Sequence, residues 1–201
     1  MNEITSQFRP KIRAVAFDLD GTLVHSPLDF AAIRDELNWP ADTDLLARLE
    51  TIGNLEERKA ADAVIRRFEM EAAEQSYLLP GVLACLQQLQ QQGIPTAILT
   101  RNIRQATTHM LERLQIPIQL VLTREDCAAK PDPEGLYRIA DQFAITTSEL
   151  LYIGDYHFDL TTAANAGAIS CLLLNEQNQH FSSMADWVMT DYASLARALT
   201  S

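Results

Sequence analysis

The chain has 201 residues, of which 47% are hydrophobic and 21% charged, a composition typical of a globular protein rather than a disordered, collagenous or repeat chain. Its 16 basic and 27 acidic side chains give a net charge of −11, which repels nucleic acid and anionic membranes over most of the surface. Because no run of 18 apolar residues occurs, and the polar segment 1–13 lacks the apolar core of a signal peptide, we predict a cytoplasmic protein with no nucleic-acid or membrane partner.

The first predicted strand, Ile12–Phe17, is followed by a long segment without strand-like runs that extends to Pro80. Apolar residues recur there at helical spacing, which predicts that the segment is helical throughout. Three apolar faces are recognised, with Phe30, Ile33 and Leu37 on the first, Leu45, Leu46 and Leu49 on the second, and Ala61, Val64, Phe68 and Ala72 on the third. Two pairs at i,i+4 spacing are interpreted as the solvated side of the third helix, Asp62 with Arg66 and Arg67 with Glu71.

Beyond Pro80 the sequence alternates between aliphatic runs and helical stretches. The runs predict buried strands at Thr96–Thr100, Leu120–Thr123, Leu150–Ile153 and Ile169–Leu174. Helices are predicted at Ile103–Leu114, Glu134–Phe143 and Asp159–Ala166, followed by an edge strand at Trp187–Met189 and a final helix to Leu199 that Asp191 caps. Such βαβ units predict an α/β fold with a doubly wound, mostly parallel sheet.

This pattern divides the chain into two parts. Residues 1–24 and 80–201 are predicted to form the α/β core, and residues 25–79 a small all-helical cap inserted after the first strand. An insertion at that point lies above the carboxyl ends of the strands, where open parallel sheets bind ligands. We therefore interpret the helical segment as a lid.

Reactive polar residues follow four of the predicted strands. Asp18 and Asp20 come after the first, Thr100 ends the second, Lys130 follows the third and Asp155 follows the fourth. Since the carboxyl ends of parallel strands meet at one edge, we expect these side chains to line one crevice. Three carboxylates would repel one another there without a counter-ion, and oxygen ligands suit Mg²⁺. With the hydroxyl of Thr100 and the charge of Lys130, the set predicts a phosphate site.

These residues fall into four motifs, Asp18-x-Asp20-Gly21-Thr22, Thr100, Lys130-Pro131 and Gly154-Asp155-x-x-x-Asp159. In this order and at strand ends, they resemble the motifs of the haloacid dehalogenase-like (HAD) superfamily of aspartate-nucleophile phosphohydrolases, over about Ile12 to Leu174. The helical insertion resembles the C1 cap of that family, and the plan is similar to that of phosphoglycolate phosphatases. The resemblance implies a Rossmann-like HAD core and a Mg²⁺-dependent phosphatase, or phosphoric monoester hydrolase, acting on a small-molecule phosphate ester.

The resemblance also implies roles for the acidic motif residues. Asp18 would be the nucleophile that forms an aspartyl phosphate, and Asp20 would act first as general acid and then as general base. The metal Mg²⁺ would bind the carboxylates of Asp18 and Asp155 and the backbone carbonyl of Asp20. Asp159 would support these ligands without binding the metal itself.

Phosphate binding is assigned by the same resemblance to Thr100, the backbone N–H of Arg101 and Lys130. The Arg101 side chain has two open interpretations, contact with substrate or exposure to solvent. His25 and His157 flank the first and fourth motifs, and exposed or supporting positions are favoured for both over a catalytic role.

Two further features have weaker signals. The turn Ile52-Gly53-Asn54, with Arg58 and Lys59 after it, is a candidate for the part of the lid that sets specificity, and a plain helix-connecting turn is the alternative. The three cysteines, Cys85, Cys127 and Cys171, are odd in number and widely separated, so we predict buried thiols rather than disulfides or zinc ligands.

Four other functions are alternatives to a phosphatase. A dehalogenase normally has a residue other than Asp at the position of Asp20, so the Asp at this position disfavours dehalogenation. A phosphonate hydrolase would also lack this Asp, and it would need a lysine from the cap, for which Lys59 is available. A sugar phosphomutase of the same superfamily keeps the same core residues and stays open. The non-enzymatic alternative is a phospho-receiver-like switch, a class that usually has no lid and carries its phosphorylated Asp on a later strand than its acidic pair.

Overall fold

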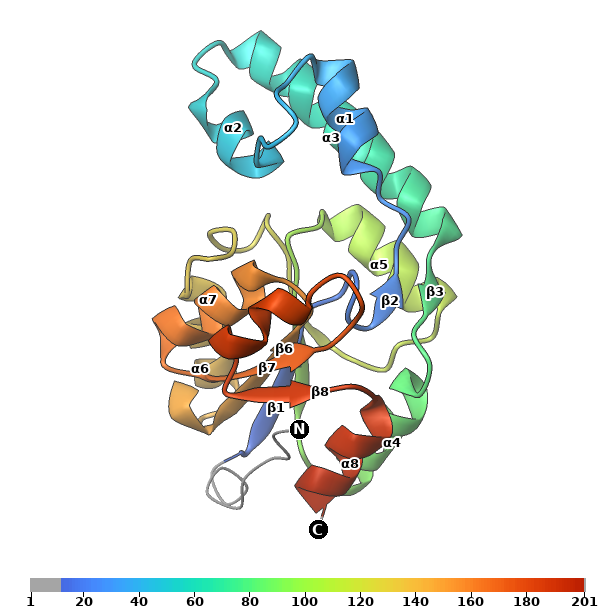
Figure 1. Ribbon diagram of the computed structural model, residues 1–201, viewed down its shortest axis with the longest axis vertical. Helices are drawn as coiled ribbons and strands as arrows, with labels where there is room; N and C mark the ends of the chain where they lie inside the picture. The colour runs from blue at the N-terminus through green and yellow to red at the C-terminus, as the bar shows by residue number, and fades with distance from the viewer. Residues whose placement is uncertain (1–11, 201) are drawn as a thin grey trace.

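The computed structural model describes residues 12–200, and a parallel sheet lies at its centre (Figure 1). Six strands form this sheet in the order β5-β4-β1-β6-β7-β8. Their bounds are Ala14–Phe17 for β1, Thr96–Leu99 for β4, Leu120–Leu122 for β5, Leu150–Gly154 for β6, Ile169–Leu173 for β7 and Trp187–Met189 for β8. Every neighbouring pair runs parallel, so the predicted α/β fold with a doubly wound parallel sheet is confirmed.

Both faces of the sheet are buried, because its strands are apolar on both sides. Val15 and Phe17 of β1 belong to the core on one face, which is covered by α4 (Val82–Gln91), α5 (Arg104–Arg113) and α8 (Tyr192–Thr200). Ala14 and Ala16 belong to the core on the other face, under α6 (Glu134–Gln142) and α7 (His157–Ala166). The central strand β1 is thus enclosed on both faces and both edges. Asp18 follows directly at its carboxyl end.

The elements predicted beyond Pro80 agree with the observed ones to within one or two residues at each end. The predicted cap of the last helix is also present, since Oδ1 of Asp191 accepts a hydrogen bond of 2.7 Å from the Ser194 N–H. The helix α4 was not predicted; in it Val82, Leu86 and Leu89 face the core, and glutamines occupy most of the exposed positions. Two short 3₁₀ helices, η2 (Thr147–Glu149) and η3 (Gln179–Met184), were also not predicted.

The helices α1 (Phe30–Leu37), α2 (Leu45–Thr51) and α3 (Leu55–Gln75) lie together at one end of the molecule (Figure 1). They enclose a small core of their own around Ile33, Leu45 and Ile65. The long helix α3 also packs on α5, and its Ala73 joins the core of the sheet. Neither α3 nor any other helix within residues 12–200 is both long and apolar enough to cross a membrane.

The segment between β1 and Pro80 is not helical throughout, so that expectation was wrong at both ends. Val24–His25 forms β2 and Tyr77–Leu78 forms β3, and the two pair antiparallel. Strands of two residues are too short to show a period-2 pattern in sequence. The pairing of β2 with β3 places the segment that enters the inserted helices beside the segment that leaves them. The His25 ring also stacks on the Tyr77 ring, with the ring centroids 4.7 Å apart.

Candidate active site

The strand order brings the predicted site residues to one edge of the sheet. Strands β4, β1 and β6 are neighbours, so Thr100, Asp18 and Asp155 follow adjacent strands at their carboxyl ends. Lys130 follows β5, the next strand outward, through a loop that returns it towards β1. The structure therefore places these four residues at the carboxyl edge of the sheet, as expected for an open parallel sheet.

Lys130 forms the centre of a buried ion-pair group. Its Nζ lies 2.5 Å from Oδ1 of Asp18 and 2.6 Å from Oδ1 of Asp159, and all three side chains are buried. Burial opposes the charged lysine, but the two carboxylates outweigh it and raise its pKa, so Lys130 is a permanent cation. Asp159 also accepts hydrogen bonds from the Tyr152 hydroxyl at 3.1 Å and the Tyr156 N–H at 3.1 Å, which hold it in place.

Three carboxylates in this group are close enough to share a cation. Ligand oxygens of Asp18, Asp155 and Asp159 all lie within 4.8 Å of one another. Burial raises the pKa of Asp18, and burial together with the charge of Asp159 raises the pKa of Asp155 to about 7. One lysine thus does not balance the buried negative charge. Because the donors are carboxylate oxygens, the site suits a hard divalent cation.

We expect cation binding to stabilise the protein more at pH 8 than at pH 5. The folded pKa of Asp155, about 7, lies above its usual value of 3.8, so the contribution of Asp155 to metal-free stability is full below pH 3.8 and is lost as the pH rises to about 7. A bound cation removes that penalty only where the carboxylate is ionised. The gain in thermal midpoint on adding Mg²⁺ should be larger at pH 8 by on the order of 5 °C. Asp155→Asn is the control, and an equal gain at both pH values in the wild type would contradict this assignment.

Asp20 has a partner that sequence analysis did not assign. Nδ2 of Asn102 donates to Oδ2 of Asp20 at 3.1 Å, while Oδ1 of Asn102 accepts from the Ile103 N–H at 2.9 Å, which fixes the orientation of the amide. Burial raises the pKa of Asp20, and the hydrogen bond from Asn102 opposes that shift. The other carboxylate oxygen of Asp20 is buried without a partner among residues 12–200. The signal in the sequence was the position of Asn102, two residues after Thr100.

Two glycines allow the acidic residues to approach the backbone. Gly21 has a φ of +81°, and a Cβ there would overlap the carboxylate of Asp155. A Cβ on Gly154 would overlap the carboxylate of Asp159. Any side chain at these positions would displace an acidic residue of the site.

Of the two arrangements left open for the Arg101 side chain, exposure to solvent does not hold, because the side chain is partly buried and paired with an inserted helix. Its Nη2 lies 2.8 Å from both carboxylate oxygens of Asp44, the N-cap residue of α2, and its guanidinium covers the ring of Phe158 at 4.2 Å. Burial alone would raise the pKa of Asp44, but the hydrogen bond from the Ala47 N–H and the contact with Arg101 lower it below its usual value. Arg101 therefore ties the end of β4 to the inserted helices. Its neighbour Thr100 is buried and accepts a hydrogen bond of 3.1 Å from the Asn102 N–H.

A second set of ion pairs joins α3 to the loop after β5. Buried Arg124 pairs with buried Glu69, and Arg66 binds Glu125 at 2.7 Å as well as Asp62 at 2.6 Å. The Asp62–Arg66 pair, interpreted as part of the solvated side of the helix, is thus partly exposed and also contacts the loop after β5. The period of a helix does not show which polar face meets another part of the chain.

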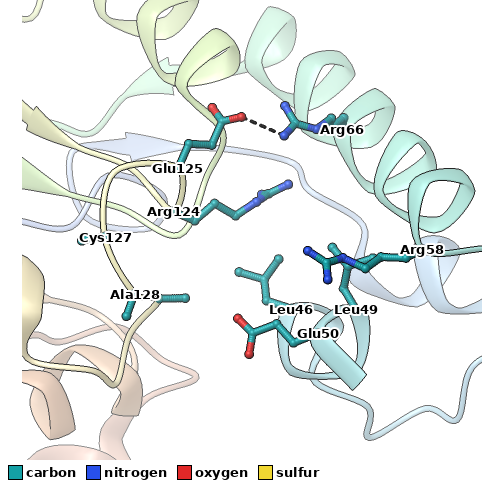
Figure 2. Close-up of a pocket in the computed structure, with 10 residues that line it drawn as sticks. Leu46, Leu49, Glu50, Arg58, Arg66, Arg124, Glu125, Cys127 and Ala128 are labelled. Carbon is teal, nitrogen blue, oxygen red and sulfur yellow. Dashed lines mark hydrogen bonds and ion pairs between the residues drawn. The ribbon is translucent and has the colours of Figure 1, made fainter. Parts of the chain in front are cut away.

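A cavity of about 200 Å³ lies beside these ion pairs, between the inserted helices and the loop after β5 (Figure 2). Its lining consists of Leu46, Leu49, Glu50, Arg58, Arg66, Arg124, Glu125, Cys127, Ala128 and Ala129. Of the turn residues singled out in the sequence, Arg58 lines the cavity, whereas Gly53 is exposed with open space around it and Lys59 pairs with Glu56 at 3.1 Å.

The remaining candidates are placed as follows. His157 packs against the rings of Tyr156 and Phe158, and burial lowers its pKa. Cys85 and Cys171 are buried as predicted, but Cys127 is only half-buried because it borders the cavity.

The doubly wound sheet, the helices inserted after β1 and the acidic crevice at the carboxyl ends of the central strands together define an α/β enzyme. The chain belongs to the haloacid dehalogenase-like hydrolases, whose family model matches residues 15–173. The predicted membership of the HAD superfamily and the prediction of a hydrolase are thereby confirmed.

Relatives and solved structures agree with this membership. The chain is 32% identical over 176 residues to an uncharacterized hydrolase of Saccharomyces cerevisiae, YOR131C, covering 84% of this chain and 80% of that protein. It is 33% identical over 186 residues to a phosphoglycolate phosphatase of Pectobacterium atrosepticum, covering 79% of each chain. A hydrolase from Pseudomonas syringae has the same fold, with a TM-score of 0.77 at 23% identity, over 93% of this chain and 97% of that one.

Proposed function

We propose that the protein is a Mg²⁺-dependent phosphatase that hydrolyses a small phosphate monoester through an aspartyl-phosphate intermediate. The observation that carries this proposal is the buried contact of 2.5 Å between Lys130 and Asp18, inside a group of carboxylates at the carboxyl edge of the sheet. The names of several relatives, phosphoglycolate phosphatases among them, support a phosphate ester as the substrate class. The net charge of −11 supports a small-molecule substrate rather than nucleic acid.

In the first step, a carboxylate oxygen of Asp18 attacks phosphorus and the bond to the ester oxygen breaks. Asp20, protonated at that moment, gives its proton to the departing alkoxide. In the second step, Asp20 takes a proton from water, which attacks the aspartyl phosphate and releases inorganic phosphate and Asp18. Burial raises the pKa of Asp20, which favours the protonated form that the first step needs.

The other motif residues would hold the phosphoryl group. Thr100 and the backbone N–H of Arg101 would donate to its oxygens, and Lys130 would balance the charge of both phosphate and nucleophile. Asp18, Asp155 and the backbone carbonyl of Asp20 would hold Mg²⁺, with Asp159 orienting Lys130 from its buried position. When bound, the ion would neutralise negative charge on the phosphoryl oxygens.

Residues 25–79 would act as a cap that excludes water from the crevice, and residues 1–24 and 80–201 as the catalytic core, of which 1–11 and 201 lie outside the described part of the chain. The contact between Arg101 and Asp44 supports the role of a cap, because it joins α2 directly to the loop after β4, which carries the proposed phosphate-binding residues. A closed cap would protect the aspartyl phosphate from reactions other than the intended hydrolysis.

Phosphate release from a panel of phosphorylated metabolites tests this proposal. We expect many turnovers per enzyme molecule on at least one small ester in Mg²⁺. Incorporation of one phosphoryl group per molecule without release would instead indicate a receiver-like switch. Transfer of the phosphoryl group to a second position of a sugar phosphate, without phosphate release, would indicate a phosphomutase.

Asn102→Ala should slow esters with poor leaving groups more than esters with good ones. Without the hydrogen bond from Asn102, Asp20 is less well placed to protonate an alkoxide, whereas a nitrophenolate hardly needs that proton. We expect kcat/KM for an alkyl phosphate to fall about 10-fold relative to that for nitrophenyl phosphate. In an Asp20→Asn background the selective loss should disappear, and equal losses for both esters in the single variant would argue against this role.

A further inference from the structure

A buried asparagine in the loop after β7 binds the backbone of the loop that carries Asp155. Asn178 is only 4% exposed, and it lies 23 positions beyond Asp155 in the chain. Its Nδ2 donates to the carbonyl oxygen of Asp155 at 2.8 Å and to that of Leu173, the last residue of β7, at 2.9 Å. Both hydrogens of the amide are thus used on backbone carbonyls, and one of these belongs to a residue that is proposed to hold Mg²⁺.

The loop that carries Asn178 gives its amide one fixed orientation. Oδ1 of Asn178 accepts from the Asn175 N–H at 2.8 Å. Oδ1 of Asn175 in turn accepts from the N–H groups of Gln177 at 2.8 Å and Asn178 at 3.1 Å, turns that asparagine side chains commonly stabilise. Rotating the Asn178 amide by half a turn would lose all three of its hydrogen bonds, because its oxygen would then face two carbonyls and its nitrogen an N–H. Asn178 is therefore a rigid support for the carbonyl of Asp155.

The peptide bond between Asp155 and Tyr156 is held at both of its polar groups. Its carbonyl oxygen accepts from Asn178, and its N–H, that of Tyr156, donates to Oδ2 of Asp159 at 3.1 Å. Since the C=O and N–H of a trans peptide point in opposite directions, the contact with Asn178 directs the N–H towards Asp159. Asp159 is the carboxylate that Lys130 binds at 2.6 Å. Asn178 thus fixes the peptide plane that links Asp155 to the buried ion-pair group.

The carboxylate of Asp155 is restricted separately from its backbone. Gly21 lies so close to it that a Cβ at that position would overlap the carboxylate. Gly21 therefore limits where the carboxylate can lie, and Asn178 limits where the backbone that carries it can lie. A ligand that is already in place needs little ordering when a cation binds, which favours affinity.

We propose that Asn178 is a positioning residue of the metal site, which holds Asp155 in place for Mg²⁺ through the backbone rather than by contact with the metal. The inference rests on the proposed Mg²⁺-dependent function and adds to it a residue that lies outside the four motifs. Partners that orient a metal ligand typically contribute about 10- to 100-fold to metal affinity. Because Asn178 acts on the backbone and not on the ligand oxygen itself, we expect an effect at the lower end of that range.

The test is the affinity of the metal-free protein for Mg²⁺ alone, measured by calorimetry in the wild type and in Asn178→Ala. Without its donor, the peptide after Asp155 is free to turn, and the dissociation constant for Mg²⁺ should rise about 10-fold. Asn165→Ala is the matched control, because Asn165 also donates its amide to a backbone carbonyl, that of Pro131 at 2.9 Å, but Pro131 is not a proposed metal ligand. This control should bind Mg²⁺ as the wild type does.

The thermal midpoints of the metal-free proteins separate positioning from a purely structural role. Loss of buried hydrogen bonds lowers the midpoint in either case, but only a positioning role changes the Mg²⁺ affinity of the folded protein. If Asn178→Ala does not fold, Asn175→Ala decides, since Asn175 is exposed and supports Asn178 through its turn. Its dissociation constant for Mg²⁺ should rise about threefold.

The inference and the proposed function fail in different ways. If the wild type binds Mg²⁺ and the folded variant binds it equally well, or if Asn165→Ala shows the same rise, Asn178 has no positioning role and the phosphatase function stands. If the wild type itself binds no Mg²⁺, the proposed metal site has failed, and the inference fails with it.

Discussion

Asp18→Asn should lower kcat by on the order of 10⁴-fold or more with every phosphate ester that the wild type hydrolyses. An amide is a poor nucleophile for phosphorus and carries no negative charge, so neither the aspartyl phosphate nor the metal site would form normally. Folding should be retained, because Lys130 keeps its contact of 2.6 Å with Asp159. The measurement is steady-state phosphate release, together with the thermal midpoint of each protein.

The matched control for this variant is Asp141→Asn, the same change at an exposed position of α6 outside the crevice. Its kcat should equal that of the wild type. Trapping of a phosphorylated protein from the wild type but not from Asp18→Asn would assign the covalent step to this residue. Activity of Asp18→Asn within tenfold of the wild type would exclude Asp18 as the nucleophile.

Removal of divalent cations should have the second largest effect, a loss of at least about 10³-fold in activity that Mg²⁺ reverses. Asp18, Asp155 and Asp159 lie within 4.8 Å of one another, and Lys130 alone does not balance their charge around a phosphate dianion. We expect Ca²⁺ not to restore activity, because it accepts more oxygen ligands, bidentate carboxylates included, and would occupy the Asp18 oxygen that must attack.

Activity is measured after chelation and during titration with each cation. Asp155→Asn should need at least about 10-fold more Mg²⁺ for half-maximal activity, since it loses one charged ligand. Full activity in excess chelator, or the same Mg²⁺ requirement in Asp155→Asn as in the wild type, would contradict the proposed metal site.

Local sequence was sufficient to predict the sheet and the position of the motif residues at its carboxyl edge. Runs such as Leu150–Ile153 are apolar at every position, which indicates a strand buried on both faces, and the polar residues after them then lie at one edge. The two-residue strands β2 and β3 could not be predicted in this way, because they are shorter than any period. The helix α4 was not predicted, although six of its ten positions are apolar and the other four are glutamines.

Only the tertiary structure decided the contacts among the site loops and between these loops and the inserted helices. Arg101 meets Asp44 across 57 positions, and Asn102 meets Asp20 across 82. Arg124 meets Glu69 across 55. Periodicity reports which face of an element is apolar, but it does not report which charged groups of two distant elements come within hydrogen-bond distance. That depends on how α2 and α3 pack over the loops after β4 and β5, and packing is set by the shape of the whole interface rather than by local sequence.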